Sequence, residues 1–136
     1  MRFMMIVHPS REEDDDEVRR LRRLREMMRY REELRQAGVL LDAEALQPAE
    51  CGLRIAYPHP GEEPVVTEGL SDEAGASIAA FTLIETPSRE EAIAWARRMP
   101  GPDGIKGGAI ELRQVLEASE VSQDAATRAK LERFRV

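Results

Sequence analysis

Six side chains have the chemistry for catalysis or ligand binding, and they come from four segments of the chain. An imidazole titrates near neutral pH and a carboxylate can exchange protons with it, so one of each suggests acid–base work. Guanidinium groups bind anions through charge-assisted hydrogen bonds, and small polar side chains orient a bound ligand. The candidate catalytic residues are His8 and Glu68, and the candidate ligand-binding residues are Arg54, Ser71, Asp72 and Arg113.

Each of these candidates has a plainer interpretation as well. His8 precedes Pro9 and either lines the mouth of a cleft or ends a strand in a turn. Glu68 is either an acid of the site or a solvated loop carboxylate, while Ser71 and Asp72 suit a turn better than a ligand. Residues such as Arg54, Glu111 and Arg113 alternate with apolar residues along their strands, so they line a polar cleft or else face the helices or the rim.

No cofactor or metal is expected. The two histidines, His8 and His59, are not part of an H-x-x-H pattern, and no C-x-x-C pair is present. The run GIKGG lacks the Walker sequence and follows a predicted helix instead of linking a strand to a helix, so it is not a phosphate loop. Cys51 has no neighbouring base in the sequence that would activate its thiol.

Composition limits the class of protein. The chain has 136 residues, enough for one domain, and its net charge of −6 disfavours a nucleic-acid partner. No apolar run is long enough to span a membrane, and the N-terminus lacks the pattern of a signal peptide. A single cysteine excludes an internal disulfide and fits a reducing compartment, which predicts a cytoplasmic protein.

The stretch 75–100 carries the strongest structural signal. Residues 77–86 are apolar and rich in β-branched and aromatic side chains, which predicts a buried strand ended by Pro87. Ser88 and Glu91 then form a capping box, and a helix over Arg89–Met99 follows with one apolar face.

A longer helix is predicted over Asp14–Gln36. Its acidic start and arginine-rich body form many i, i+4 pairs, so the arginines are better explained by a solvated helix than by nucleic-acid binding. Its inward-facing stripe is expected to contain Leu21, Leu24, Met28, Arg31 and Leu34.

Further strands are expected over 2–7, 39–46, 51–57, 64–67 and 109–115, and a last short helix over 124–134, capped by Ser122, is expected to pack through Leu131 and Phe134. The resulting order, β-α-β-hairpin-β-α-β, predicts an α+β, ferredoxin-like fold with two helices on one face of an antiparallel sheet. Phe3 to Val7 are all apolar, so both faces of the first strand should be buried. With little chain left to cover the open face, we expect a second subunit there and hence a homodimer.

The chain resembles the YCII-related proteins, and specifically their branch named for a D-G-P-F motif. The matching stretches, in family order, are MRFMMIV, LRQAGVLLDAEALQP, VVTEGLSDEAGASIAAFTLIETPSREEAIAWARRMP and GGAIELRQVLE. The resemblance implies a YCII-related domain over residues 1–118, a C-terminal helical tail over 119–136, and a dimeric α+β barrel with a cleft between the two sheets. Where the branch has D-G-P-F, this chain has Glu68-Gly69-Leu70-Ser71, and the histidine of the first helix that pairs with an aspartate in better-known members is missing.

Two functional classes remain open. The resemblance implies, first, a dimer that binds a small molecule, with an anion as one candidate, in a regulatory role, because similar proteins are encoded beside extracytoplasmic-function sigma factors. The second class is a small acid–base enzyme of the lyase, isomerase or cofactor-free oxygenase type with its site in the dimer cleft, which rests on analogy of fold. The missing dyad histidine favours the first class. No nucleic acid and no membrane are expected as partners.

Overall fold

A computed structural model of the chain describes residues 1–9, 16–70, 78–101 and 108–134. The main sheet consists of β1 (Arg2–His8), β2 (Leu40–Ala45), β5 (Ala80–Glu85) and β6 (Ala109–Gln114). A second sheet is the hairpin of β3 (Leu53–Ala56) and β4 (Val65–Glu68). The helices are α1 (Glu17–Gln36), α2 (Arg89–Arg98), α3 (Ala118–Val121) and α4 (Ala125–Arg133), and a short 3-10 helix, η1, covers Ala49–Cys51.

The main sheet is antiparallel, in the order β2-β5-β1-β6. Each of the helices α1 and α2 connects two strands of this sheet that are separated by one other strand, which is the split βαβ arrangement. The α+β class and the predicted element order are therefore confirmed, and the topology is compatible with a ferredoxin-like fold. Within the described residues the sheet is open and does not close into a barrel.

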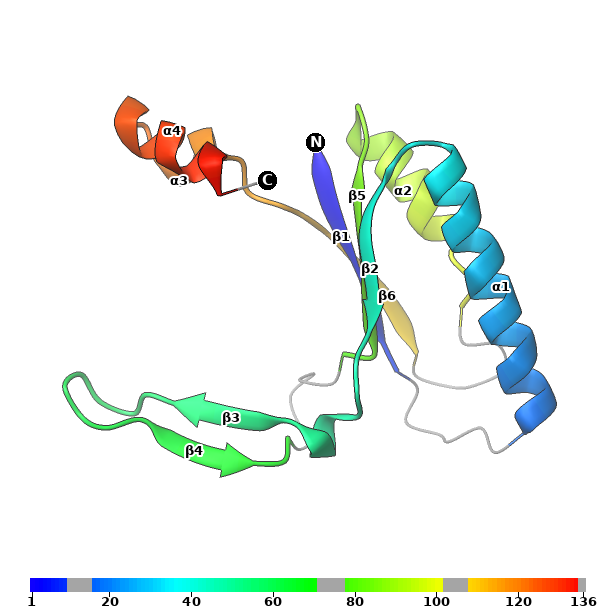
Figure 1. Cartoon of the computed structure of the whole chain (residues 1–136), viewed down its shortest axis with the longest axis horizontal. Helices are drawn as coiled ribbons and strands as arrows, with labels where there is room; N and C mark the ends of the chain where they lie inside the picture. The colour runs from blue at the N-terminus through cyan, green and yellow to red at the C-terminus, as the bar shows by residue number, and fades with distance from the viewer. Residues whose placement is uncertain (10–15, 71–77, 102–107, 135–136) are drawn as a thin grey trace.

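The core lies between the main sheet and the helices α1 and α2, which cover the same face (Figure 1). Phe3 and Met5 of β1 point to this face together with Ile84 of β5, and all three are buried against Tyr30 and Leu34 of α1. Two-residue alternation sends the intervening side chains of each strand to the opposite face. We call that opposite face of the main sheet the open face.

The predicted inward stripe of α1 is wrong at most of its positions. Leu21, Leu24 and Met28 are 45%, 56% and 62% exposed, whereas Leu34 of the stripe is buried as predicted, together with Tyr30, which the stripe did not include. The helix has apolar side chains on two sides, and the tyrosine determines which side packs on the sheet. Its hydroxyl donates a hydrogen bond to the main-chain oxygen of Trp95 at 2.6 Å, so the polar end of this ring is satisfied at the helix–helix contact.

Of the predicted capping box at the start of α2, the half in which Ser88 accepts a hydrogen bond is confirmed. Ser88 has an extended backbone, and its Oγ accepts a hydrogen bond from the main-chain nitrogen of Glu91 at 3.2 Å. The helix ends at Arg98, one residue before the predicted end, and Met99 is buried in the core. Arg98 lies over the ring of Trp95 and forms an ion pair with Glu33 of α1, so it ties the two helices together.

The C-terminal tail differs from the prediction in three respects. It contains an additional helix, α3, and the cap of α4 is Asp124 instead of Ser122. The side chain of Asp124 accepts hydrogen bonds from the main-chain nitrogen and the hydroxyl of Thr127, which lowers the pKa of this carboxyl group. Phe134 is 85% exposed, so it does not pack the tail as expected.

The β3–β4 hairpin and the tail helices both extend from the side of the main sheet that α1 and α2 leave uncovered (Figure 1). The hairpin stands apart from the main sheet, and its apolar residues Leu53, Ile55, Val65 and Val66 are about half exposed. A two-stranded ribbon without further packing is only marginally stable in water. The open face lies between the hairpin and the tail helices (Figure 1).

Candidate functional site

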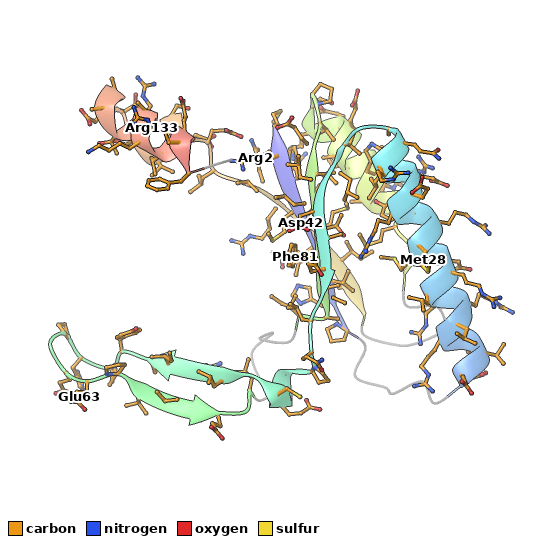
Figure 2. All side chains as sticks on the ribbon, viewed as in Figure 1. Arg2, Met28, Asp42, Glu63, Phe81 and Arg133 are labelled. Carbon is orange, nitrogen blue, oxygen red and sulfur yellow. The ribbon has the colours of Figure 1, made fainter. Side chains whose placement is uncertain are left out.

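The open face has an apolar centre. Strand pairing places Met4 and Ile6 of β1 beside Leu83 and Phe81 of β5, all on the side away from the helices. Ile6 is only 8% exposed although it is not part of the core cluster beneath α1 and α2. Figure 2 shows the side chains of Phe81 and Asp42 on this side of the sheet. The expectation that both faces of β1 are buried is met within one chain at Ile6, whereas Met4 on the same face is only partly buried.

His8 lies at the end of β1 and contacts Glu111 of β6. Its Nε2 atom is 3.1 Å from Oε1 of Glu111, and Oε2 of the same carboxylate is 3.4 Å from Nε of Arg113. The side chains of His8, Glu111 and Arg113 are 26%, 42% and 71% exposed, so this cluster is accessible from solvent. We call these three residues the His8 cluster.

The local sequence explains why the His8 cluster forms. Glu111 and Arg113 are two residues apart on β6 and therefore point to the same face. In the antiparallel ladder, Glu111 pairs with Ile6 and Ala109 pairs with His8, so the imidazole lies diagonally across from the carboxylate. The small side chain of Ala109 leaves room for this contact.

Chemically, the cluster can hold a proton at a defined place. A carboxylate that accepts a hydrogen bond from one imidazole nitrogen orients the ring and selects the tautomer, which is the relationship found in catalytic and metal-binding histidines. The guanidinium group keeps hydrogen-bond donors beyond the one that faces Glu111, since it has five. The arrangement suits a ligand with a polar or anionic end and an apolar body.

The opposite edge of the open face is acidic. Asp42 and Glu44 of β2 are exposed and pair in the ladder with Leu83 and Phe81, so they point to the same side as the apolar centre. Farther along the sheet, the Nε atom of Arg2 lies 3.9 Å from the Oε1 atom of Glu117. The apolar centre is therefore bordered by the His8 cluster on β1 and β6 and by two carboxylates on β2.

The predicted site residues fall into two separate groups. His8 and Arg113 share the open face and are joined through Glu111. Arg54 and Glu68 lie on the β3–β4 hairpin, which is a different sheet and stands away from β1 in Figure 1. Ser71 and Asp72 lie outside the described residues.

Gly69 and Leu70 have a main-chain role at the base of the hairpin. Gly69 adopts a φ of +78°, and its nitrogen donates to the main-chain oxygen of Gly52 at 2.7 Å. The next nitrogen, that of Leu70, donates to Ala49 of η1 at 3.0 Å. These bonds hold the end of β4 against η1. They explain the need for a glycine at position 69, and they do not involve the side chain of Glu68.

Glu111 was considered with Arg54 and Arg113 as a residue that could line a polar cleft, but its contact with His8, which completes the cluster, was not predicted. The sequence separates it from His8 by 103 positions, so only the pairing of the two strands reveals their contact. The useful signal was the alternation of charged and apolar residues over residues 109–113, next to a strand that ends in histidine. In the described residues, no group of three histidine, cysteine or acidic side chains is placed to hold a metal ion, and no helix is long and apolar enough to cross a membrane.

The fold and this face define an α+β domain. In the described residues, α1 and α2 cover one side of an antiparallel sheet, and an ionisable cluster lies on the other side. The sequence matches the YCII-related domain over residues 1–119, and the chain belongs to this family. A search of curated proteins finds no match to the sequence.

Proposed function

We propose that the protein is a homodimer that binds a small molecule in a cleft formed between the open faces of two subunits. The His8 cluster at the edge of an apolar centre is the observation that carries this proposal. Apolar surface of this kind, bordered by charged groups, is typical of an interaction site, and ligand sites combine apolar walls with a few convergent polar groups.

The ligand class follows from the groups at the edge. Arg113 offers N–H donors to an anion or a carbonyl oxygen, and His8 can donate or accept a proton beside it. The apolar body of the ligand would lie on Met4, Ile6 and the ring of Phe81. A small carboxylate or carbonyl compound fits these features. A regulatory role, an association with a sigma factor, the D-G-P-F branch and a cytoplasmic location stay predictions that accompany this proposal.

A thermal-shift screen tests the binding function. The probes are small carboxylic acids, keto acids and ketones at millimolar concentration, measured with the wild type and with His8→Ala and Arg113→Gln. A ligand that binds the folded state raises the melting temperature according to its concentration and affinity. We expect at least one probe class to stabilise the wild type and both variants to lose most of that shift. A panel that shifts no melting temperature, or shifts all three proteins equally, would count against a site at the His8 cluster.

The contact between His8 and Glu111 also favours the second candidate, an acid–base enzyme. An imidazole oriented by a carboxylate is the usual arrangement of a general base. Incubating each stabilising probe with the protein, and following its consumption by NMR, separates the two functions. If the wild type turns a probe over while His8→Ala still binds it without reaction, the protein is an enzyme. If neither protein changes the probe, the site binds only.

A further inference from the structure

The helix-covered side of the main sheet has a groove at its edge. The groove lies between α2 and β6 and encloses about 290 Å³. Its apolar lining comes from β1, α2 and β6, and consists of Phe3, Ile93, Ala96, Ile110 and Leu112. The two residues of β6 also pack against the core, which fixes their positions. Because the groove is on the opposite side of the sheet from the open face, it is separate from the His8 cluster.

Two arginines flank this groove. Arg89 and Arg97 of α2 are exposed, and neither side chain forms an ion pair or a hydrogen bond within the part of the chain that the structure describes. Eight residues of α-helix rise about 12 Å, so the two arginines mark the two ends of the groove. The helix runs antiparallel to β6, since it connects two strands that are both antiparallel to β1. Arg89 therefore lies toward Gln114, and Arg97 lies toward Ile110.

The outer edge of β6 has main-chain groups available for pairing. Among the described residues, β6 is at the edge of the sheet and its neighbour is β1. The nitrogen of Val115 donates to the oxygen of Arg2 at 2.9 Å, and hydrogen-bonded pairs alternate along an antiparallel ladder. Residues 109, 111 and 113 therefore bond to β1 as well. The main-chain groups of residues 110, 112 and 114 point the other way, toward the free edge.

The groove and the free edge involve the same residues of β6. Ile110, Leu112 and Gln114 line the groove with their side chains and direct their N–H and C=O groups to the edge. A strand added at this edge would place the side chains opposite these three residues in the groove. Its residues opposite positions 110 and 114 would be about 13 Å apart, which matches the separation of the two arginines. A small molecule would use the guanidinium groups and leave the edge unpaired, whereas an extended peptide uses both.

We propose that β6 binds an extended peptide segment of another protein by antiparallel strand addition, and that the segment has the pattern acid-x-apolar-x-acid. The apolar residue packs on Leu112 and Ile93, and the two acids pair with Arg97 and Arg89. Main-chain hydrogen bonds supply affinity, while the groove and the two guanidinium groups select the sequence. This proposal goes beyond the function proposed for the open face and does not depend on it.

The probe is the acetylated and amidated peptide TETVTET, titrated into the isotope-labelled full chain and followed by NMR. We expect the amide signals of residues 110, 112 and 114 to shift and to saturate with a dissociation constant below about 1 mM. Hydrogen exchange gives a sharper readout. The amides of residues 110, 112 and 114 should exchange quickly in the free protein and slow down with the peptide, while those of residues 111 and 113 are slow throughout because they bond to β1.

Two control peptides separate the contributions of charge and main chain. TKTVTKT reverses both acids and should bind at least about tenfold more weakly than TETVTET. Methylation of the valine nitrogen in TETVTET keeps the charge but removes a donor from the ladder and blocks its place, so binding should be lost.

Matched variants of the protein test the two arginines. Arg89→Gln and Arg97→Gln should each weaken binding of TETVTET by about two- to fivefold, as expected for an exposed ion pair. Arg25→Gln removes the same charge from the exposed surface of α1, away from the groove, and should leave binding unchanged.

Protection of alternate amides by TETVTET, lost on methylation and weakened in both groove variants, supports the proposal. Three results would overturn it. The first is no shift of the β6 amides at about 2 mM peptide. The second is equal binding of TETVTET and either control peptide. The third is slow exchange of residues 110 and 112 without peptide, which would show that the edge is already covered. Absence of peptide binding would leave the site proposed at the His8 cluster unaffected.

Discussion

The Nε2 atom of His8 and the Oε1 atom of Glu111 lie 3.1 Å apart on the open face of the main sheet, although the two residues are 103 positions apart in the sequence. The contact exists because β1 and β6, the first and last strands of the split βαβ fold, are neighbours in the sheet. It gives the face a defined polar group at the edge of an apolar centre, and the proposed function depends on it.

Replacing Glu111 by Ala should affect ligand binding more than folding. The pair is partly exposed, and exposed ion pairs contribute about 0–1 kcal/mol to stability, so the free energy of unfolding should change by less than about 1 kcal/mol. Binding of any probe that stabilises the wild type should weaken by about tenfold, because the imidazole loses its orientation. Chemical denaturation and calorimetric titration measure the two effects. A large loss of stability with unchanged binding would make the pair structural.

A matched pair of substitutions tests which side of α1 faces the sheet. Leu34→Ala removes a fully buried side chain and should cost about 2–5 kcal/mol of unfolding free energy. Leu24→Ala, on the exposed side of the same helix, should change it by no more than about 0.5 kcal/mol. Urea denaturation compares the two variants directly. Equal costs, or a larger cost for Leu24→Ala, would restore the stripe that the sequence predicted.

Tyr30 should make stability fall at high pH. Burial raises the pKa of its hydroxyl from 10.0 to about 12, and the charge of Arg98 opposes this shift only in part. Since the folded-state pKa is the higher one, the contribution is fully present below pH 10 and is lost as the pH rises through about 12. Tyr30→Phe also removes the hydrogen bond to Trp95 and should cost about 1–3 kcal/mol at neutral pH.

The control for this prediction is the shape of the pH profile. Unfolding free energy measured between pH 9 and about 12 should decline more steeply for the wild type than for Tyr30→Phe, because only the wild type has this phenol. Parallel profiles for the two proteins would show that ionisation of Tyr30 does not contribute to the decline.

Gly69 should tolerate no side chain without strain. Its φ of +78° lies in the left-handed region, so Gly69→Ala should cost about 1–2 kcal/mol and loosen the base of the hairpin. Hydrogen exchange at the main-chain nitrogens of residues 69 and 70 reports this loosening directly. Gly101→Ala is the matched control, since its φ is outside that region and a Cβ there meets no atom within 4 Å. Unchanged exchange in Gly69→Ala would indicate that the bonds to η1 do not depend on the glycine.

The sequence predicted those features that local patterns determine. The strand Ala80–Glu85 and the capped helix Arg89–Arg98 were recognisable because the cap, the proline that ends the strand and the apolar period all lie within a few positions of each other. The phase of α1 was not recognisable, since apolar residues line two of its sides and the choice depends on the contact between Tyr30 and Trp95. The partner of His8 was hidden for the same kind of reason, because it comes from a distant strand.

The separation of the predicted site residues has a topological cause. Arg54 and Glu68 belong to an insertion between β2 and β5 that forms its own two-stranded sheet, and strand alternation cannot reveal that this hairpin leaves the main sheet. His8 and Arg113 lie on the same face in the structure because β1 and β6, the first and last strands of the split βαβ fold, are neighbours.

The mass of the protein in solution tests the central proposal, that the open face is the interface of a homodimer. Light scattering after size exclusion, at micromolar concentration, should give twice the 15.3 kDa of one chain for the wild type. Leu83→Arg places a charge at the centre of the open face and should give a monomer with an unchanged circular dichroism spectrum. A wild type that elutes with the mass of a single chain would contradict the proposal.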